Sequence, residues 1–246
     1  MMEPKVAAVD GSTLQARVYE SLRLALLRGR FVPGEPFSLR SVAEMVGTSA
    51  MPVREAVRRL VADGVLVQSP DRTIRVVLAS HAAYDELMRL RVYIEGYATV
   101  RAARRADKKL LSKLARFNEQ MRKSASKFDI ESALAANYSF HFAVYETADS
   151  PQLLDVISGL WLRSGPMIAI ARQNAQEART MFLTGVKAHQ RIIDALAERD
   201  EEAARFGVGI DLRAASAWLK RHYSEPSAAV PTKRPSLKRT VLTPIL

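Results

Sequence analysis

Four polar residues interrupt the apolar faces of three predicted helices in the second half of the chain. Asn137 and His141 are four residues apart on an apolar stripe, so they share one face of a helix. His189 lies at the centre of a second apolar stripe, and Asp211 shares a face with apolar residues of a third helix. Burying such groups without partners costs on the order of a few kcal/mol each, so we expect them to contact one another or a bound species.

Two imidazoles, a carboxylate and an amide oxygen are suitable ligands for a first-row divalent cation of the Zn, Ni or Mn class. The alternative is a metal-free hydrogen-bond network around core histidines. A metal-dependent enzyme is a third hypothesis, because an open His/Asp metal site can activate water. The chain lacks HExxH and GxSxG motifs and has no cysteine, so no nucleophile or general base is evident and we do not expect an enzyme.

A second group of polar residues lies near the amino terminus, in the stretch SLRSVAEMVGTSAMPVREAVRRLVA (38–62). Ser38 and Ser49 are suited to cap two short helices, and Gly47 between them fits a helix end that needs a positive φ. Pro52 falls in the first turn of the second helix, where its missing N–H is not needed.

The second of these helices has an apolar face and a basic face. The apolar stripe consists of Val53, Ala56, Val57, Leu60 and Val61. Arg54, Arg58 and Arg59 lie off this stripe and point to solvent or to a ligand. This pattern predicts a helix-turn-helix whose second helix enters a DNA major groove. The alternative is a helical hairpin with a solvated basic face.

The flanking segments extend this unit to a winged helix-turn-helix. An amphipathic helix is predicted from Thr13 to about Gly29, followed by a Pro/Gly turn at FVPGEPFS. Two β-branched runs, Val65–Gln68 and Thr73–Val77, predict a hairpin with Arg72 near its tip. An arginine there would contact the phosphate backbone of double-stranded DNA.

The rest of the chain is predicted to be helical. Expected helices are 81–106, 108–124, 129–148, 151–172, 176–198 and 201–222. Six helices joined by short loops form an antiparallel bundle. The expected fold is therefore mainly α: a winged helix-turn-helix (12–78), a six-helix bundle (79–222) and a flexible basic tail (223–246).

Composition gives only coarse limits. The net charge of +11 and the pI of about 10.1 favour a polyanionic partner, but the excess is spread along the chain. The absence of cysteine fits a reducing compartment. The N-terminus lacks a signal-peptide pattern, and no apolar run approaches the length of roughly 18 residues that would span a membrane. We expect a cytoplasmic protein that does not bind membranes.

The segment LRGRFVPGEPFSLRSVAEMVGTSAMPVREAVRRLVADGVL closely resembles the winged-helix domain of GntR-family bacterial transcription regulators. The bundle resembles the ligand-binding FCD domain of the FadR-type branch, and the resemblance covers roughly residues 12–222. It implies a repressor that binds a palindromic operator as a homodimer and responds to a small carboxylate effector. It also implies DNA contacts at Arg40, Ser49, Met51 and Arg54. With Pro52, Arg58 and Arg72, these are the expected DNA-binding residues.

Two positions in the winged domain depart from the family pattern. Ala50 stands where the family usually has a base-reading arginine, which removes a contact worth about 1–3 kcal/mol of discrimination between bases. Thr73 replaces a usual wing glycine, so we expect an altered turn.

In the bundle, the resemblance places a metal site at Asn137, His141, His189 and Asp211, where the family's pattern is an Asp-x-x-x-His pair and two later histidines. Asn137 thus replaces the Asp of this pattern, and Asp211 replaces the last His. Together the two exchanges move the single carboxylate across the site and keep the formal charge of the site. Arg91 matches a position that pairs with an effector carboxylate, so the expected effector-binding residues are Arg91 and these four. The alternative for Arg91 is a structural pair with Glu95, four residues later.

Overall fold

The computed structural model describes residues 14–223. The disorder that we expected for residues 1–11 and the flexible tail from residue 224 lie outside this range. Tyr223, which was assigned to the tail, is instead buried, and its hydroxyl donates a hydrogen bond to the Ala79 carbonyl. The ordered chain thus extends beyond the predicted boundary at residue 222.

Three helices form most of the N-terminal half: α1 (Leu14–Leu27), α2 (Leu39–Val46) and α3 (Ala50–Ala62). As predicted, Ser38 caps α2 by accepting a hydrogen bond from the Ser41 amide, and α2 ends where Gly47 has a φ of 67°. Ser49 holds the N-cap position of α3, but its side chain makes no cap hydrogen bond. Its hydroxyl is therefore left for another partner.

The predicted apolar face of α3 is buried except at Val61, which is 36% exposed. Likewise Leu14 is 53% exposed, although it was expected to begin the buried stripe of α1. Both residues lie at the end of a helix, where the neighbouring elements no longer cover the stripe.

A three-stranded antiparallel sheet of β1 (Pro36–Phe37), β2 (Leu66–Gln68) and β3 (Ile74–Val76) completes this half, in the order β1-β3-β2. The predicted β2–β3 hairpin is present. The segment around Pro36 was expected to be only a turn, but Pro36 and Phe37 pair with Arg75 and Ile74. A two-residue strand is too short to show an alternating pattern, which explains why it was missed.

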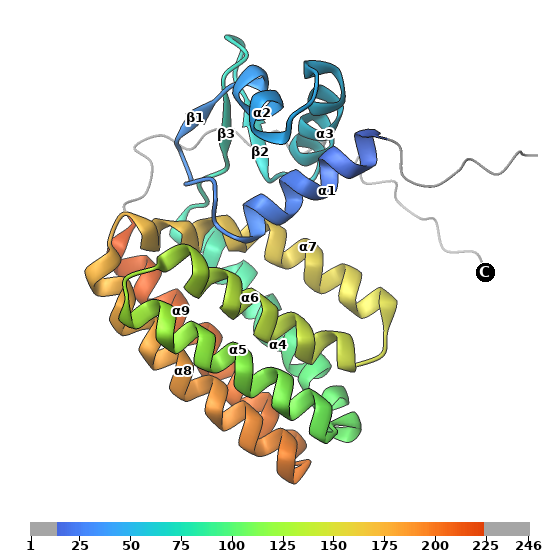
Figure 1. Cartoon of the computed structure of the whole chain (residues 1–246), viewed down its shortest axis with the longest axis vertical. Coiled ribbons are helices and arrows are strands. Elements are labelled where there is room, and N and C mark those ends of the chain that lie inside the picture. Colours follow the sequence, from blue (N-terminus) through green and yellow to red (C-terminus); the bar gives the residue numbers. More distant parts are fainter. Residues whose placement is uncertain (1–13, 224–246) are drawn as a thin grey trace, which may run out of the picture.

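Six helices form the C-terminal half, as predicted (Figure 1). They are α4 (His81–Arg105), α5 (Lys108–Ser126), α6 (Ile130–Thr147), α7 (Pro151–Ile168), α8 (Ala175–Glu198) and α9 (Glu201–His222). The helix predicted over 151–172 ends earlier, and a 3₁₀ turn, η1 (Ala169–Arg172), follows it. Pro166 lies inside α7 and lacks an N–H, which weakens helical hydrogen bonding just before this change.

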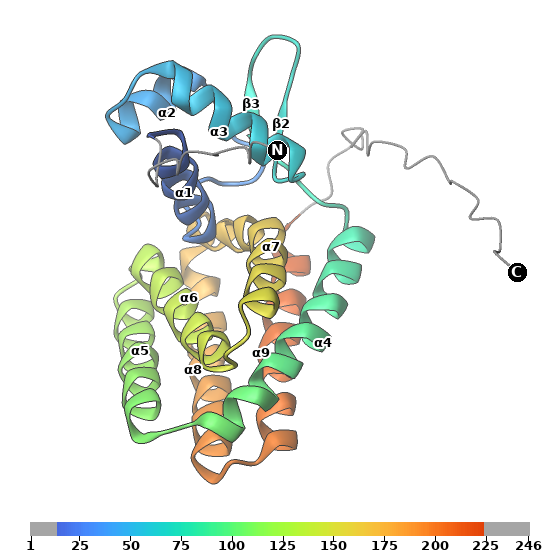
Figure 2. The ribbon, with the colours of Figure 1, turned by 90° about the vertical axis from the view of Figure 1, so that its right-hand side faces the viewer.

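The two halves are in contact along α1, which lies over α7 in both views (Figures 1 and 2). Gly29 follows α1 with a φ of 66°, and a Cβ atom at this position would lie 2.9 Å from Leu134 Cδ1 and 3.2 Å from Ala169 Cβ. The Arg172 guanidinium donates to the Gly29 carbonyl at 3.1 Å. Because of these contacts, the buried apolar residues of the two halves form one continuous cluster.

Arg30 adds a polar contact between the halves, with its Nε 3.1 Å from Glu131 Oε1 of α6. Sequence patterns assigned the halves to separate domains but gave no indication of this interface.

One segment, Pro151–Arg172, is long and apolar enough to span a membrane by length and composition, with a mean hydropathy of 1.3. We had expected no such segment. Half of it is buried within the protein, where Ile157 and Trp161 belong to the core. Packing inside the bundle therefore accounts for its apolar character.

Candidate functional site: a DNA-binding face and a buried polar pocket

Exposed residues of α2, α3 and the wing gather at the end of the molecule away from the bundle (Figures 1 and 2). Six of the seven predicted DNA-binding residues are exposed there: Arg40, Ser49, Met51, Arg54, Arg58 and Arg72. Met51 is 68% exposed, which is unusual for a large apolar side chain without a partner. An apolar contact with a thymine methyl group would suit it.

The arginines on this face differ in how they are already paired. Arg40 Nε lies 3.0 Å from Glu44, and Arg58 Nη2 lies 2.8 Å from Glu55. Arg54 forms no ion pair with any residue that the structure describes. Its guanidinium can therefore bind a base or phosphate without first leaving a carboxylate, unlike those of Arg40 and Arg58.

Two residues of α3 contact the rest of the N-terminal half. Pro52 is buried on the inward face, so a DNA contact by its ring, as we predicted, is not compatible with its position. Arg59 is exposed, as we expected, and its guanidinium lies 3.9 Å from the centre of the Tyr19 ring. The Tyr19 hydroxyl in turn donates to Asp63, which fixes α1 against the end of α3.

Arg72 occupies the strained position of the wing turn, with a φ of 65°. Its amide donates to the Ser69 carbonyl, while the Thr73 amide donates to the Asp71 carboxylate. The left-handed residue of this turn is thus Arg72 and not Thr73, the position at which we expected a change from the family's glycine. The wing turn therefore carries its positive charge on its most strained residue.

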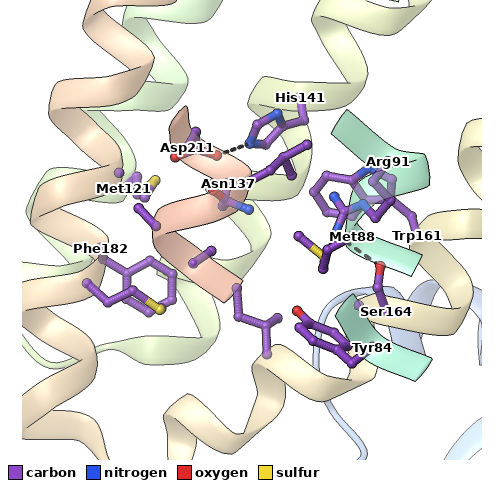
Figure 3. Close-up of a pocket in the computed structure, with 17 residues that line it drawn as sticks. Tyr84, Met88, Arg91, Met121, Asn137, His141, Trp161, Ser164, Phe182 and Asp211 are labelled. Atoms are coloured by element: carbon purple, nitrogen blue, oxygen red, sulfur yellow. Dashed lines mark hydrogen bonds and ion pairs between the residues drawn. The ribbon is translucent and has the colours of Figure 1, made fainter. Parts of the chain in front are cut away.

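In the bundle, His141 of α6, His189 of α8 and Asp211 of α9 come together as predicted. His141 Nε2 lies 3.1 Å from Asp211 Oδ2 and 3.2 Å from His189 Nε2. His189 Nε2 lies 3.9 Å from Asp211 Oδ2, so the three atoms form a triangle. All three side chains are buried. Asn137 is only half-buried and lines the adjoining pocket beside His141 (Figure 3).

A chain of hydrogen bonds fixes the orientation of the His141 ring. Tyr145 donates its proton to Glu95, so its oxygen accepts from His141 Nδ1, which lies 3.0 Å away. This contact holds Nε2 of His141 toward Asp211 and His189. Histidines that ligate metals commonly donate their other ring N–H to a fixed acceptor in this way.

Burial determines the charge states in this cluster. Burial lowers the pKa of His189 to about 3, so its ring is neutral at physiological pH. Burial alone would raise the pKa of Asp211, but the hydrogen bond from His141 and the electrostatic effect of His189, His141 and Arg91 lower it overall. His189 Nδ1 is buried with no hydrogen-bond partner. A neutral His189 ring and an ionised Asp211 carboxylate are the protonation states in which these two groups bind a metal.

The spacing of the three atoms also fits a cation. A triangle with these three sides has its centre about 2 Å from each corner, and bonds from zinc to imidazole nitrogen or carboxylate oxygen measure about 2.0–2.2 Å. The distances between the three atoms are therefore compatible with a divalent cation between them.

A cavity of about 50 Å³ adjoins the cluster and is lined by α4, α6, α7, α8 and α9. Arg91 lies on its wall and forms the structural pair that we considered, with Nε 2.6 Å from Glu95 Oε1. It also donates to the Ser164 hydroxyl at 3.0 Å and lies over the Trp161 ring. This pairing still leaves a guanidinium N–H for a ligand.

Sequence reasoning missed Tyr84, Trp161 and Ser164, which line the same cavity. Tyr84, Met88 and Arg91 recur at intervals of four and three residues on one face of α4, so a helical stripe leading to Arg91 was a usable signal. Trp161 and Ser164 gave none, because only the packing of α7 against α4 brings them to the pocket.

The two halves of the chain match known families separately. Residues 14–76 match the bacterial regulatory proteins of the gntR family, and residues 86–207 match the FCD domain. This chain belongs to the GntR family of regulators and carries an FCD domain.

Two regulators match this GntR regulator over most of their own length. The HTH-type transcriptional regulator McbR of Escherichia coli (strain K12) is 27% identical over 202 residues, which covers 82% of this chain and 90% of McbR. A probable D-xylose utilization operon transcriptional repressor of Paenarthrobacter nicotinovorans is 28% identical. The match covers 78% of this chain and 83% of that repressor.

Solved structures agree with this assignment. Escherichia coli McbR/YncC superposes with a TM-score of 0.79 at 26% identity, over 87% of this chain and 100% of that chain. A GntR regulator from Rhodococcus sp. RHA1 has the same fold, with a TM-score of 0.70 at 23% identity and the same coverage. The matching families are transcription regulators, not enzymes, so the metal-dependent enzyme that we kept as an alternative is not supported.

Proposed function

We propose that this regulator represses transcription by binding a palindromic operator as a homodimer in the cytoplasm. We further propose that a small carboxylate in the bundle changes its affinity for DNA. The observation that carries the effector site is the closed cluster of His141, His189 and Asp211 beside a cavity. Repression is supported by the relative from Paenarthrobacter nicotinovorans, which is described as a repressor.

The DNA-binding half presents its contacts from two elements. The α3 helix offers Ser49, Met51 and Arg54 from its exposed N-terminal part, the part that enters a major groove in helix-turn-helix proteins. Arg72 in the wing is placed to contact phosphates, which adds affinity that does not depend on sequence.

An exposed apolar face supports association of two copies. Leu90, Tyr93 and Tyr97 fall on one face of α4 and are 49%, 77% and 54% exposed, and α9 beside it exposes Phe206 to 65%. A continuous apolar face of this kind on a regulator is normally covered by a partner. A second copy is the partner that a palindrome requires, because two half-sites need two recognition helices.

We propose that His141, His189 and Asp211 hold a divalent cation, with the Asn137 carbonyl oxygen as a weaker neighbour. The cation would supply a Lewis acid to which an effector carboxylate can bind. Tyr145, Glu95 and Arg91 hold His141 in the orientation that this requires. A metal-free pocket remains the second candidate, because Asn137 replaces a carboxylate of the family pattern.

Metal content distinguishes these candidates. We expect elemental analysis to find a near-stoichiometric divalent metal in the unmodified protein and none after His141→Ala combined with His189→Ala. His222→Ala is the matched control, because His222 bonds only within its own helix, to the Trp218 carbonyl. An unmodified protein without metal, stabilised by carboxylates equally with and without a chelator, would establish the metal-free pocket instead.

A further inference from the structure

A buried phenol at the far end of the pocket has no protein partner. Tyr84 is 4% exposed and lines the same cavity as Arg91 and Asp211. Its hydroxyl forms no hydrogen bond with any of the residues 14–223. In Figure 3 this hydroxyl is directed into the pocket from the side opposite His141.

The Tyr84 hydroxyl is a hydrogen-bond donor at every physiological pH. Burial raises its pKa to about 12, so the proton stays on the oxygen. Buried donors in native proteins are nearly always satisfied, by protein, water or ligand. A donor that meets none of these in the protein itself is available to a molecule in the cavity.

The other hydroxyl that lines the pocket, that of Ser164, is already engaged, whereas the buried Trp161 Nε1 has no partner. The Ser164 hydroxyl donates to the Leu160 carbonyl and accepts from Arg91. The wall between Tyr84 and the metal-binding cluster is otherwise mostly apolar: Met88, Ile168, Met181, Phe182 and Leu212. A molecule that fills the pocket therefore meets polar groups at its two ends and apolar side chains between them.

The dimensions limit the length of such a molecule. Tyr84 and Arg91 are seven residues apart on α4, or about 10 Å along the helix axis. The cavity of about 50 Å³ is small, since one water alone needs about 10–15 Å³ on this measure. Only a short chain fits between the two ends.

We propose that Tyr84 donates a hydrogen bond to a terminal oxygen of the effector, which is therefore a short carboxylate with a second oxygen function at its other end. Terminal hydroxy acids and short dicarboxylates belong to this class. The proposal rests on the proposed function, because it takes the first carboxylate to bind at the cluster of His141, His189 and Asp211.

The test compares three acids of equal chain length on the full-length, metal-loaded protein: butyrate, 4-hydroxybutyrate and succinate. In calorimetry we expect the unmodified protein to bind 4-hydroxybutyrate or succinate at least about tenfold more tightly than butyrate. In Tyr84→Phe this preference disappears, while butyrate affinity and metal content stay unchanged. Tyr138→Phe, a half-buried tyrosine outside the pocket lining, keeps the preference.

Two results would overturn the assignment of Tyr84. One is a preference that survives in Tyr84→Phe, and the other is an unmodified protein that binds butyrate as tightly as the other two acids. If none of the three acids binds the unmodified protein, the carboxylate effector itself is refuted. The two failures are thus distinct, because only the last one removes the proposed function.

Discussion

At the scale of single residues, the most informative feature of the DNA-binding face is the unpaired guanidinium of Arg54. We expect Arg54→Ala to weaken operator binding by roughly 10- to 100-fold, because a bidentate arginine contact is worth about 1–3 kcal/mol. The fold should be unchanged, since the side chain is exposed. Fluorescence anisotropy at fixed salt, with an operator selected from genomic DNA, measures the effect.

Arg116→Ala is the control for this experiment, because Arg116 is an exposed arginine of α5 in the bundle. Equal affinities of Arg54→Ala and the unmodified protein at the same salt concentration would remove Arg54 from the DNA interface.

Replacing Arg72 with glycine should raise the stability of the protein and weaken its binding to DNA. Its φ of 65° costs a non-glycine residue about 1 kcal/mol, which Arg72→Gly should recover as an increase in the free energy of unfolding. The same substitution removes a phosphate contact, so operator affinity and its salt dependence should both fall. Urea denaturation and anisotropy at several salt concentrations measure the two effects. Arg72→Ala should weaken binding equally without gaining stability, and a stabilised variant with full affinity would contradict the phosphate contact.

At the scale of secondary-structure elements, Gly29 is where the two halves meet. Gly29→Ala should lower the free energy of unfolding by more than the cost of its positive φ alone, because the new Cβ would crowd Leu134 and Ala169. Gly64→Ala is the matched control: its φ is 73°, and nothing lies within 4 Å of a Cβ built there. We expect the difference between the two variants to be about 1–3 kcal/mol in chemical denaturation. If both variants lost the same free energy of unfolding, the contacts around Gly29 would accommodate the new Cβ without cost.

The elements themselves could be predicted well where their periodicity is long. All six bundle helices and the three helices before the wing follow from apolar stripes, caps and breakers. The strand at Pro36–Phe37 could not be predicted, because it depends on pairing with a strand far away in the sequence. The 3₁₀ turn continues the apolar segment of α7, so its sequence pattern does not separate it from the helix.

The candidate site also has parts that the sequence predicts and parts that it does not. His141, His189 and Asp211 could be found because a polar residue on an apolar stripe needs a partner. The link from His141 through Tyr145 to Glu95 was not predictable, since it depends on α4 and α6 being neighbours. For the same reason, Pro52 was assigned to the DNA contacts, although the fold buries it.

At the scale of the whole molecule, we propose that the exposed apolar residues of α4 and α9 form the interface between two copies. Tyr93→Asp should shift a dimer toward monomers, because a charge placed at the centre of this face cannot be buried in a symmetric interface without large cost. Operator affinity should fall with it, while the monomer keeps its fold, since Tyr93 is 77% exposed. Sedimentation velocity measures the association state.

Val156→Asp is the control, as Val156 is an exposed apolar residue on α7. A Tyr93→Asp protein with an unchanged sedimentation coefficient would place the interface elsewhere.

Helix α6 also touches the DNA-binding half, through Leu134 against Gly29 and Glu131 against Arg30. His141 lies seven residues beyond Leu134, about 10 Å along the same axis. A straight α-helix barely deforms over two turns, so any displacement of His141 moves the surface on which Gly29 rests. A signal between the halves then needs no unfolding of the segment that joins them, because α6 contacts the DNA-binding half and also carries His141 of the polar cluster.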